Sequence, residues 1–129
     1  AVMRASDSPS RICYSIINTF LGRMCLSGDI YSLSDEQWKL IDEGMAFYRR
    51  AADIIKSGMT VKCECTALSF NNPTGNQLVI REFGGRSLVI AHRFANSSPV
   101  DMSFAAGKKI VAEYGCADSD FSAQAWIIE

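Results

Sequence analysis

The stretch Ala51-Ala-Asp-Ile-Ile-Lys-Ser-Gly58-Met-Thr-Val-Lys-Cys-Glu-Cys65 decides the fold, because the period of the apolar residues changes within it. Before Gly58, apolar side chains recur every three or four residues, which is the repeat of an amphipathic helix. After Gly58 they alternate with polar side chains, which is the repeat of a half-buried β-strand. Glycine also suits the end of a helix. The sequence therefore predicts an α+β chain, with a helical segment over residues 1–58 and a β domain over residues 59–129.

Two helices are predicted in the first segment. Ser8 and Pro9 supply an N-cap and a first-turn proline for a helix over residues 9–24. Ser34 and Gln37 have the spacing of a capping box, which predicts a long second helix over residues 35–58. The second helix contains Gly44, which costs about 1 kcal/mol relative to alanine. We therefore expect either a close contact with a neighbouring element or a slight bend at this glycine.

The β domain is predicted to contain six short strands separated by residues that favour turns. The strands are expected at residues 60–70, 77–83, 87–94, 100–104, 109–114 and 121–128. Gly84 and Gly85 predict a tight hairpin between the second and third of them. Short strands at this spacing are typical of an antiparallel all-β sandwich or an open barrel.

Composition excludes several classes of partner. The chain has 129 residues, 48% of them apolar, and a formal net charge of -1 with acids and bases interspersed, so no basic stripe is available for nucleic acid. An odd number of cysteines, five, favours a reducing compartment and predicts a cytoplasmic protein. The apolar run over residues 12–26 is too short for a bilayer, so no membrane partner is expected. We interpret the start at Ala1 as a cut inside a longer protein.

Several stretches carry a resemblance to a known family. They are Met24-Cys-Leu-Ser-Gly-Asp-Ile30, Leu33-Ser-Asp-Glu-Gln-Trp-Lys-Leu-Ile-Asp-Glu-Gly44, Phe47-Tyr-Arg-Arg-Ala-Ala-Asp-Ile-Ile-Lys-Ser-Gly58 and Leu88-Val-Ile-Ala-His-Arg-Phe-Ala-Asn96, with Ala125 and Trp126 in the last strand. The first three resemble the end of the catalytic barrel of melibiase-type α-galactosidases and related raffinose-synthase-like proteins. The others are similar to the antiparallel domain that follows that barrel.

The resemblance implies a C-terminal part of a retaining glycoside hydrolase that acts on terminal α-galactosides. Residues 1–58 would close its catalytic TIM barrel, and residues 59–129 would form a β-sandwich that clamps the outer face of the final helix. The substrate of the parent protein would be an oligosaccharide or a galactoside, and the reaction would use no metal and no organic cofactor. Because nothing upstream supplies the nucleophile strand, the isolated chain is predicted to be inactive.

Arg4-Ala-Ser-Asp7 resembles the segment that carries the family's acid/base aspartate. The resemblance makes Asp7 the candidate acid/base group, one of the two carboxylates that a retaining glycosidase requires. Arg4 would be the neighbouring cation that tunes it, and a substrate-binding residue. The alternative is that Asp7 is an exposed acid beside a helix start, where it would stabilise the helix dipole by roughly 0.3–1 kcal/mol.

A second candidate segment is Ser27-Gly28-Asp29. These residues could line the sugar-binding mouth of a barrel, because loops after barrel strands carry active sites and glycine allows close backbone approach. Tyr31 is the aromatic residue expected nearest to a ligand. The alternative is an ordinary turn.

Other residues with chemical potential are interpreted as structural. Cys63 and Cys65 share one face of a strand, but the remaining cysteines are scattered, so buried small hydrophobic residues are favoured over a zinc site. His92 is expected to be hydrogen-bonded in or beside the core. Trp38 and Trp126 are expected to pack in the core rather than to stack on sugars.

Two further hypotheses follow from the same patterns. The chain could be a non-catalytic carbohydrate-binding or interaction module, or a structural domain with no site. The helical segment also carries more apolar surface than a small β domain is expected to cover, which predicts a homodimer through the helical face. The residues of this stripe are Ile12, Ile16, Phe20, Trp38, Met45 and Tyr48.

Overall fold

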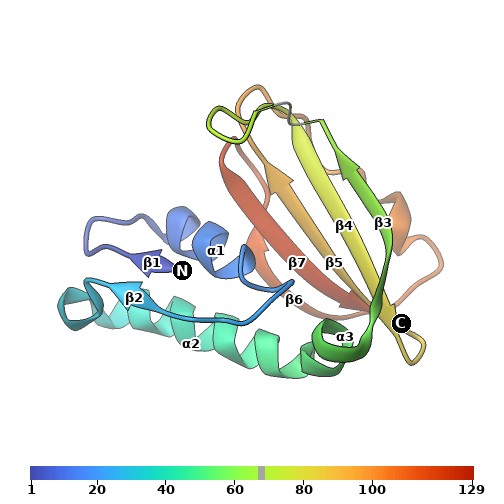
Figure 1. The fold of residues 1–129 in the computed structure, drawn as a ribbon, viewed down its shortest axis with the longest axis horizontal. Coiled ribbons are helices and arrows are strands. Elements are labelled where there is room, and N and C mark those ends of the chain that lie inside the picture. Colours follow the sequence, from blue (N-terminus) through green and yellow to red (C-terminus); the bar gives the residue numbers. More distant parts are fainter. Residues whose placement is uncertain (67–68) are drawn as a thin grey trace.

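Helices come first along the chain and the strands of an antiparallel sheet come after them (Figure 1). The computed structural model describes residues 1–66 and 69–129. The predicted α+β class and the antiparallel β part are confirmed. Within the described residues, no helix has the length and apolar character needed to cross a bilayer.

The helical segment contains α1 (Pro9–Ile17), α2 (Asp35–Arg50) and α3 (Ala52–Ser57). Both predicted starts are confirmed, because the hydroxyls of the N-cap serines accept backbone N–H groups and α2 has a complete capping box. The ends differ from the prediction. The first helix stops at Ile17 rather than near residue 24, and the long helix is interrupted at Ala51, whose backbone (φ -91°, ψ 0°) separates α2 from α3.

Five strands form one sheet with the order β3-β4-β5-β7-β6, and all neighbouring pairs are antiparallel. The strands are β3 (Met59–Cys65), β4 (Asn76–Phe83), β5 (Arg86–Arg93), β6 (Ile110–Cys116) and β7 (Ser122–Ile128). The predicted hairpin at Gly84 and Gly85 is confirmed, since both have positive φ as a tight turn requires. The predicted first strand ends early, at Cys65, and its residues Ala67 and Leu68 lie outside the described residues.

The predicted strand over residues 100–104 is wrong. Met102–Ala105 forms a short 3₁₀ helix, η2, and the carboxylate of Asp101 accepts the Ser103 N–H at its start (3.0 Å). The segment packs on the outer face of the sheet, where the rings of Phe104 and Trp126 lie 5.1 Å apart. A segment that covers the face of a sheet can therefore show the same alternation of apolar and polar residues as a strand within the sheet.

The two faces of the sheet bury different clusters. The inner face packs against the helices and shares one core with them, which includes Ile16, Phe20, Leu88, Ile90, Ala125 and Ile127. The outer face buries Val89, Ala91, Trp126 and Ile128 beneath Val100 and Phe104. Helices on one side and the η2 segment on the other therefore take the place of the second sheet of a sandwich.

Gly44 marks the closest approach between α2 and its neighbours. A Cβ atom at Gly44 would lie 2.7 Å from Ile16 Cγ2 on α1 and 2.9 Å from the Tyr114 ring on β6. The Tyr114 hydroxyl also donates to the Leu40 carbonyl (2.8 Å). Of the two expectations for this glycine, the close contact is therefore the one that the structure shows.

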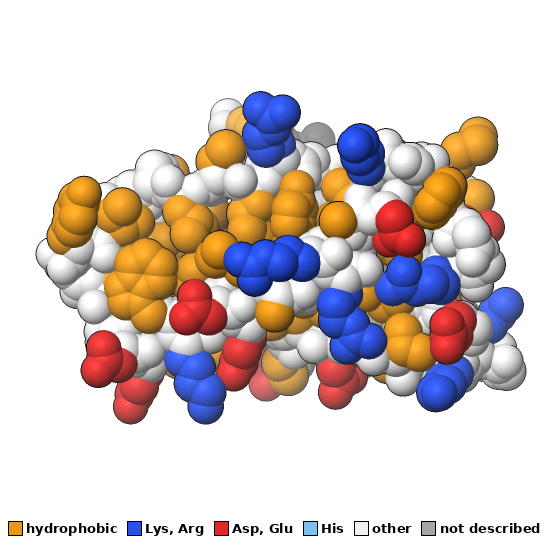
Figure 2. Space-filling model, turned by 90° about the horizontal axis from the view of Figure 1, so that it is seen from below, with side chains coloured by type: hydrophobic (Ala, Val, Ile, Leu, Met, Phe, Trp, Pro, Cys, Tyr) orange, Lys and Arg blue, Asp and Glu red, His pale blue; other side chains and the backbone are white. Residues whose placement is uncertain are grey.

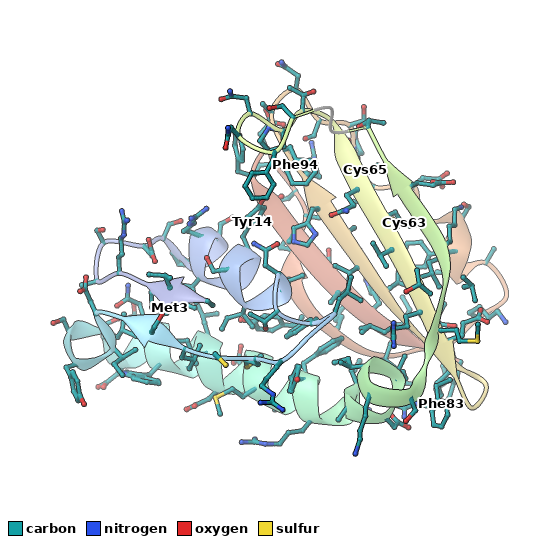
Figure 3. The ribbon with its side chains drawn as sticks, viewed as in Figure 1. Met3, Tyr14, Cys63, Cys65, Phe83 and Phe94 are labelled. Carbon is teal, nitrogen blue, oxygen red and sulfur yellow. The ribbon has the colours of Figure 1, made fainter. Side chains whose placement is uncertain are left out.

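His92 lies on the inner face of β5 and is 6% exposed. Its ring stands edge-on to Tyr14 (5.2 Å between centroids) and stacks with Phe94 (6.1 Å) (Figure 3). The predicted burial is confirmed, but the expected hydrogen bond is not, because neither ring nitrogen has a partner. Burial lowers the pKa of His92 from 6.5 to about 4.

This burial predicts a loss of stability in mild acid. The folded state keeps His92 neutral down to about pH 4, whereas the unfolded chain binds a proton near pH 6.5. Stability is therefore full above pH 6.5 and falls as the pH decreases, by about 2 kcal/mol between pH 7 and pH 5. Urea unfolding of the wild type and His92→Phe at both pH values measures this effect. An equal decline in both proteins would contradict the assignment.

The shared core gives a second stability prediction. Ile90 is 2% exposed and packs against the helices, so Ile90→Ala should lower the free energy of unfolding by roughly 2–5 kcal/mol. The matched control is Ile110→Ala on edge strand β6, where the side chain is 42% exposed and the cost should stay under about 1 kcal/mol. Equal thermal midpoints for the two variants would show that the register of β5 is wrong.

Candidate functional site

The candidate residues lie at the ends of two short strands that no sequence pattern predicted. β1 (Val2–Met3) pairs with β2 (Ser27–Gly28) in parallel, and the Asp29 N–H donates to the Met3 carbonyl (2.8 Å). Helix α1 connects the two strands, so the unit has the order strand, helix, strand, followed by helix α2 (Figure 1). Because parallel strands end at the same edge, the segments that follow β1 and β2 lie next to each other.

Gly28 allows the two strands to approach. It has φ +94°, and a Cβ atom there would lie 2.2 Å from the carbonyl oxygen of Met3. Met3 is fully buried in the shared core, so its backbone cannot move away without loss of packing. The glycine proposed for the barrel mouth is therefore required by the backbone geometry of β2.

Asp7 closes a turn immediately after β1. Its carboxylate accepts the Arg4 N–H (2.9 Å), and its own N–H donates to the Arg4 carbonyl (3.0 Å). The ion pairs within the described residues are Lys62–Glu64 and Arg86–Asp53. Arg4 therefore holds the carboxylate through its backbone rather than through its guanidinium group.

Gln37 is a site residue that the sequence analysis missed. Its side-chain oxygen accepts the Ser34 N–H (2.8 Å) in the predicted capping box. Its amide nitrogen donates to the carbonyls of Ala5 (3.0 Å) and Asp7 (3.1 Å), so it ties the start of α2 to the turn that holds Asp7. The sequence did contain a signal for this role. A capping box accepts glutamate or glutamine at this position, and of the two only glutamine carries an NH₂ group that can donate.

The segment after β2 contributes the other predicted residues. Ser27, Gly28 and Asp29 are exposed at the edge where Arg4 and Asp7 also lie. Tyr31, in the short helix η1 (Ile30–Ser32), is 99% exposed and therefore encloses no ligand pocket by itself. The structure thus brings the two predicted segments together on an open surface.

A groove of about 710 Å³ lies elsewhere, between α1, α2 and β6, and includes none of these residues. Burial raises the pKa of Cys13 and of Tyr114 within it, which keeps both groups neutral at physiological pH. A neutral thiol is a poor nucleophile, so burial does not activate Cys13 for covalent chemistry.

The cysteines differ from the prediction. Cys25, Cys63, Cys65 and Cys116 are exposed, and Cys13 is half-buried, so the interpretation as buried hydrophobic residues is wrong for four of the five. Cys63 and Cys65 do share a face, but they lie on an edge strand. The tryptophan prediction fits better, because Trp126 is 2% exposed and Trp38 packs against the core.

The double role of Gln37 is testable. Gln37→Glu keeps the capping oxygen but places a carboxylate against two carbonyl oxygens, so it should cost about 1–3 kcal/mol and speed hydrogen exchange at the Arg4 and Asp7 amides. Ser34→Ala is the control, since it removes only the cap and costs about 1 kcal/mol. Unchanged exchange at both amides in Gln37→Glu would contradict the assigned hydrogen bonds.

Comparisons with protein-family models, with curated proteins and with solved structures found no match for this chain. The geometry of the described residues therefore carries the functional argument. Its strongest feature is the edge where β1 and β2 end.

Proposed function

We propose that this chain is the C-terminal part of a retaining glycoside hydrolase that acts on terminal α-galactosides. One observation carries the proposal: Asp7 and Asp29 follow two parallel strands that are joined by a helix and end at the same edge. This repeat of strand and helix is the unit of a (β/α)₈ barrel, whose active site lies where the strands end. In this proposal residues 1–58 close the barrel.

In the proposed mechanism Asp7 is the acid/base group. It would protonate the glycosidic oxygen in the first step and activate a water molecule in the second, with a carboxylate from another strand of the parent as nucleophile roughly 5–5.5 Å away. The Arg4 N–H, which donates to the carboxylate, would fix its position. Two carboxylates are sufficient for this chemistry, so the proposal includes neither a metal nor an organic cofactor. Substrate contacts are proposed for Arg4, Ser27, Gly28, Asp29 and Tyr31.

The β part would support the barrel by holding its last helices. Arg86 donates to the Arg50 carbonyl (3.1 Å) at the end of α2 and forms an ion pair with Asp53 (3.3 Å). Arg81 donates to the Ile54 carbonyl (3.0 Å) in α3. Cationic groups are favourable at helix C-termini, where carbonyls lack partners within the helix. These contacts support the proposed clamp.

An apolar surface on the helical segment also supports the proposal. Figure 2 shows hydrophobic side chains gathered on the underside of the molecule. Met24, Leu26, Met45 and Tyr48 line a hollow between α2 and the segment that precedes β2. We propose that neighbouring barrel elements cover this surface in the parent protein. Met45 and Tyr48 also belong to the stripe through which the sequence predicts a homodimer, whereas Ile12, Ile16 and Phe20 of that stripe are fully buried in the core.

A carbohydrate-binding module is the weaker alternative. Such modules stack sugars on exposed aromatic rings, whereas Trp126 and Phe104 pack against each other on the outer face of the sheet. Five free thiols in the described part of the chain support the proposed cytoplasmic location, because disulfides are rare there.

The isolated chain is expected to show no turnover of an aryl α-galactoside. Double displacement needs a second carboxylate at the right distance, and the proposal assigns that group to another part of the parent. A fluorogenic substrate at neutral pH measures the rate. Turnover that disappears in Asp7→Asn would place the complete catalytic pair within these residues and contradict the proposal.

A second test of the proposal measures weak binding of a sugar to the candidate site by NMR. We expect methyl α-galactoside at millimolar concentration to shift the amide resonances of residues 4–7 and 27–31, and methyl α-glucoside to shift them less. Asp7→Asn should reduce these shifts, whereas the control Asp101→Asn should not. Resonance shifts confined to the sheet would favour the carbohydrate-binding module instead.

A further inference from the structure

The two edges of the five-stranded sheet are protected differently. Helices α1 and α2 pack beside edge strand β6, and Arg50 donates to the Val111 carbonyl there (3.1 Å). At the opposite edge, β3 pairs with β4 alone within the part of the chain that the structure describes (Figure 1). All seven residues of β3 are exposed. An uncovered edge strand presents free backbone groups on which another strand can pair.

The register of β3 identifies which backbone groups are free. The Thr66 N–H donates to the Asn76 carbonyl (2.9 Å), in line with the β3–β4 register. Hydrogen-bonded pairs alternate along an antiparallel ladder, so Lys62 and Glu64 also direct their backbone groups toward β4. The N–H and C=O groups of Cys63 and Cys65 therefore point away from the sheet.

The charges of β3 are complementary to those of a second β3 strand that runs antiparallel to it. Lys62 and Glu64 flank Cys63, lie 3.2 Å apart (Nζ to Oε1), and have side chains that are 43% and 65% exposed. If a second β3 runs antiparallel with a two-fold axis at Cys63, each Lys62 faces the Glu64 of the other copy. These are non-hydrogen-bonded positions, where opposing side chains are closest.

The remaining positions fit the same register. Across this axis Cys63 would face Cys63 of the other copy as a hydrogen-bonded pair, with Cα atoms about 5.5 Å apart. Val61 would face Cys65 of the other copy. Cys63 and Cys65 follow one another along the open edge (Figure 3). No like charges oppose each other at residues 61–65. A bulge between Thr60 and Lys62 limits the regular edge to this region.

We propose that β3 is an interaction surface for a second copy of this chain. The two β3 strands pair antiparallel about Cys63 and join the two sheets into one. The contact is isologous, so one surface serves both copies and the assembly closes as a dimer. The proposal is independent of the glycosidase function, because none of its residues belongs to the proposed catalytic site.

Charge reversal in a sedimentation series tests the register. Lys62→Glu and Glu64→Lys should each raise the dimer dissociation constant at least about tenfold, because each places like charges opposite one another twice. The double variant should recover wild-type association, and the two single variants mixed together should form a heterodimer. Lys39→Glu, an equal charge change at an exposed site on α2, should have no effect.

Crosslinking locates the axis. With oxidised glutathione as the electron acceptor, wild type and Cys65→Ser should form a disulfide between the two Cys63 residues, since a Cα separation of about 5.5 Å lies within the disulfide range. Cys63→Ser should not. A monomer at all concentrations would overturn the proposal, as would association that Lys62→Glu leaves unchanged. Association lost in Met45→Glu alone would place the second copy on the helical face and also overturn it.

Discussion

The contact between Gly44 of α2, Ile16 of α1 and Tyr114 of β6 determines how the parts of this chain fit together. A single Cβ atom at Gly44 would come within 3 Å of both neighbours. With α2 so close, the Tyr114 hydroxyl reaches the Leu40 carbonyl. Helix α1 packs against both α2 and the sheet. Helices and sheet therefore bury one common core.

The candidate site depends on the same contact through α1. This helix connects β1 to β2, so its fixed position sets the two strands side by side and brings the segments that follow them to one edge. Gln37, at the start of α2, then holds the turn that contains Asp7. The sheet contributes indirectly, by holding the ends of α2 and α3 through Arg86 and Arg81. Half-buried Asp7 and exposed Asp29 thus rest on a buried support.

Local sequence signals predicted local structure well. Ser8, Ser34 and the Gly84-Gly85 pair work through neighbours in the chain, so spacing alone identified two helix starts and a hairpin. The predictions were wrong where contacts between distant parts of the chain determine the local structure. The segment around Phe104 alternates because it covers Trp126, and the helix breaks at Ala51 without a glycine or proline to announce it.

In the candidate site, too, local features were predicted and tertiary contacts were not. Asp7 and the Ser27-Gly28-Asp29 segment were identified as candidates, but two-residue strands have no detectable period, so their parallel pairing could not be predicted. His92 lacks a hydrogen bond because its neighbours are Tyr14 and Phe94, which no local pattern reveals. Cys63 and Cys65 were predicted to be buried, but they are exposed on edge strand β3. The alternation of apolar and polar residues does not show whether a strand lies at the edge or in the middle of a sheet.

The candidate site depends on the parallel pairing of β1 with β2, which brings the two candidate segments to one edge. The Asp29 N–H to Met3 carbonyl hydrogen bond, 2.8 Å long, is the bond nearest to that edge. Scalar coupling across hydrogen bonds, measured by NMR between the Asp29 nitrogen and the Met3 carbonyl carbon, detects it directly. Because the two strands are paired, we expect a coupling comparable to those between β5 and β7. Absence of this coupling while the β5–β7 couplings are observed would show that β1 and β2 do not pair as described.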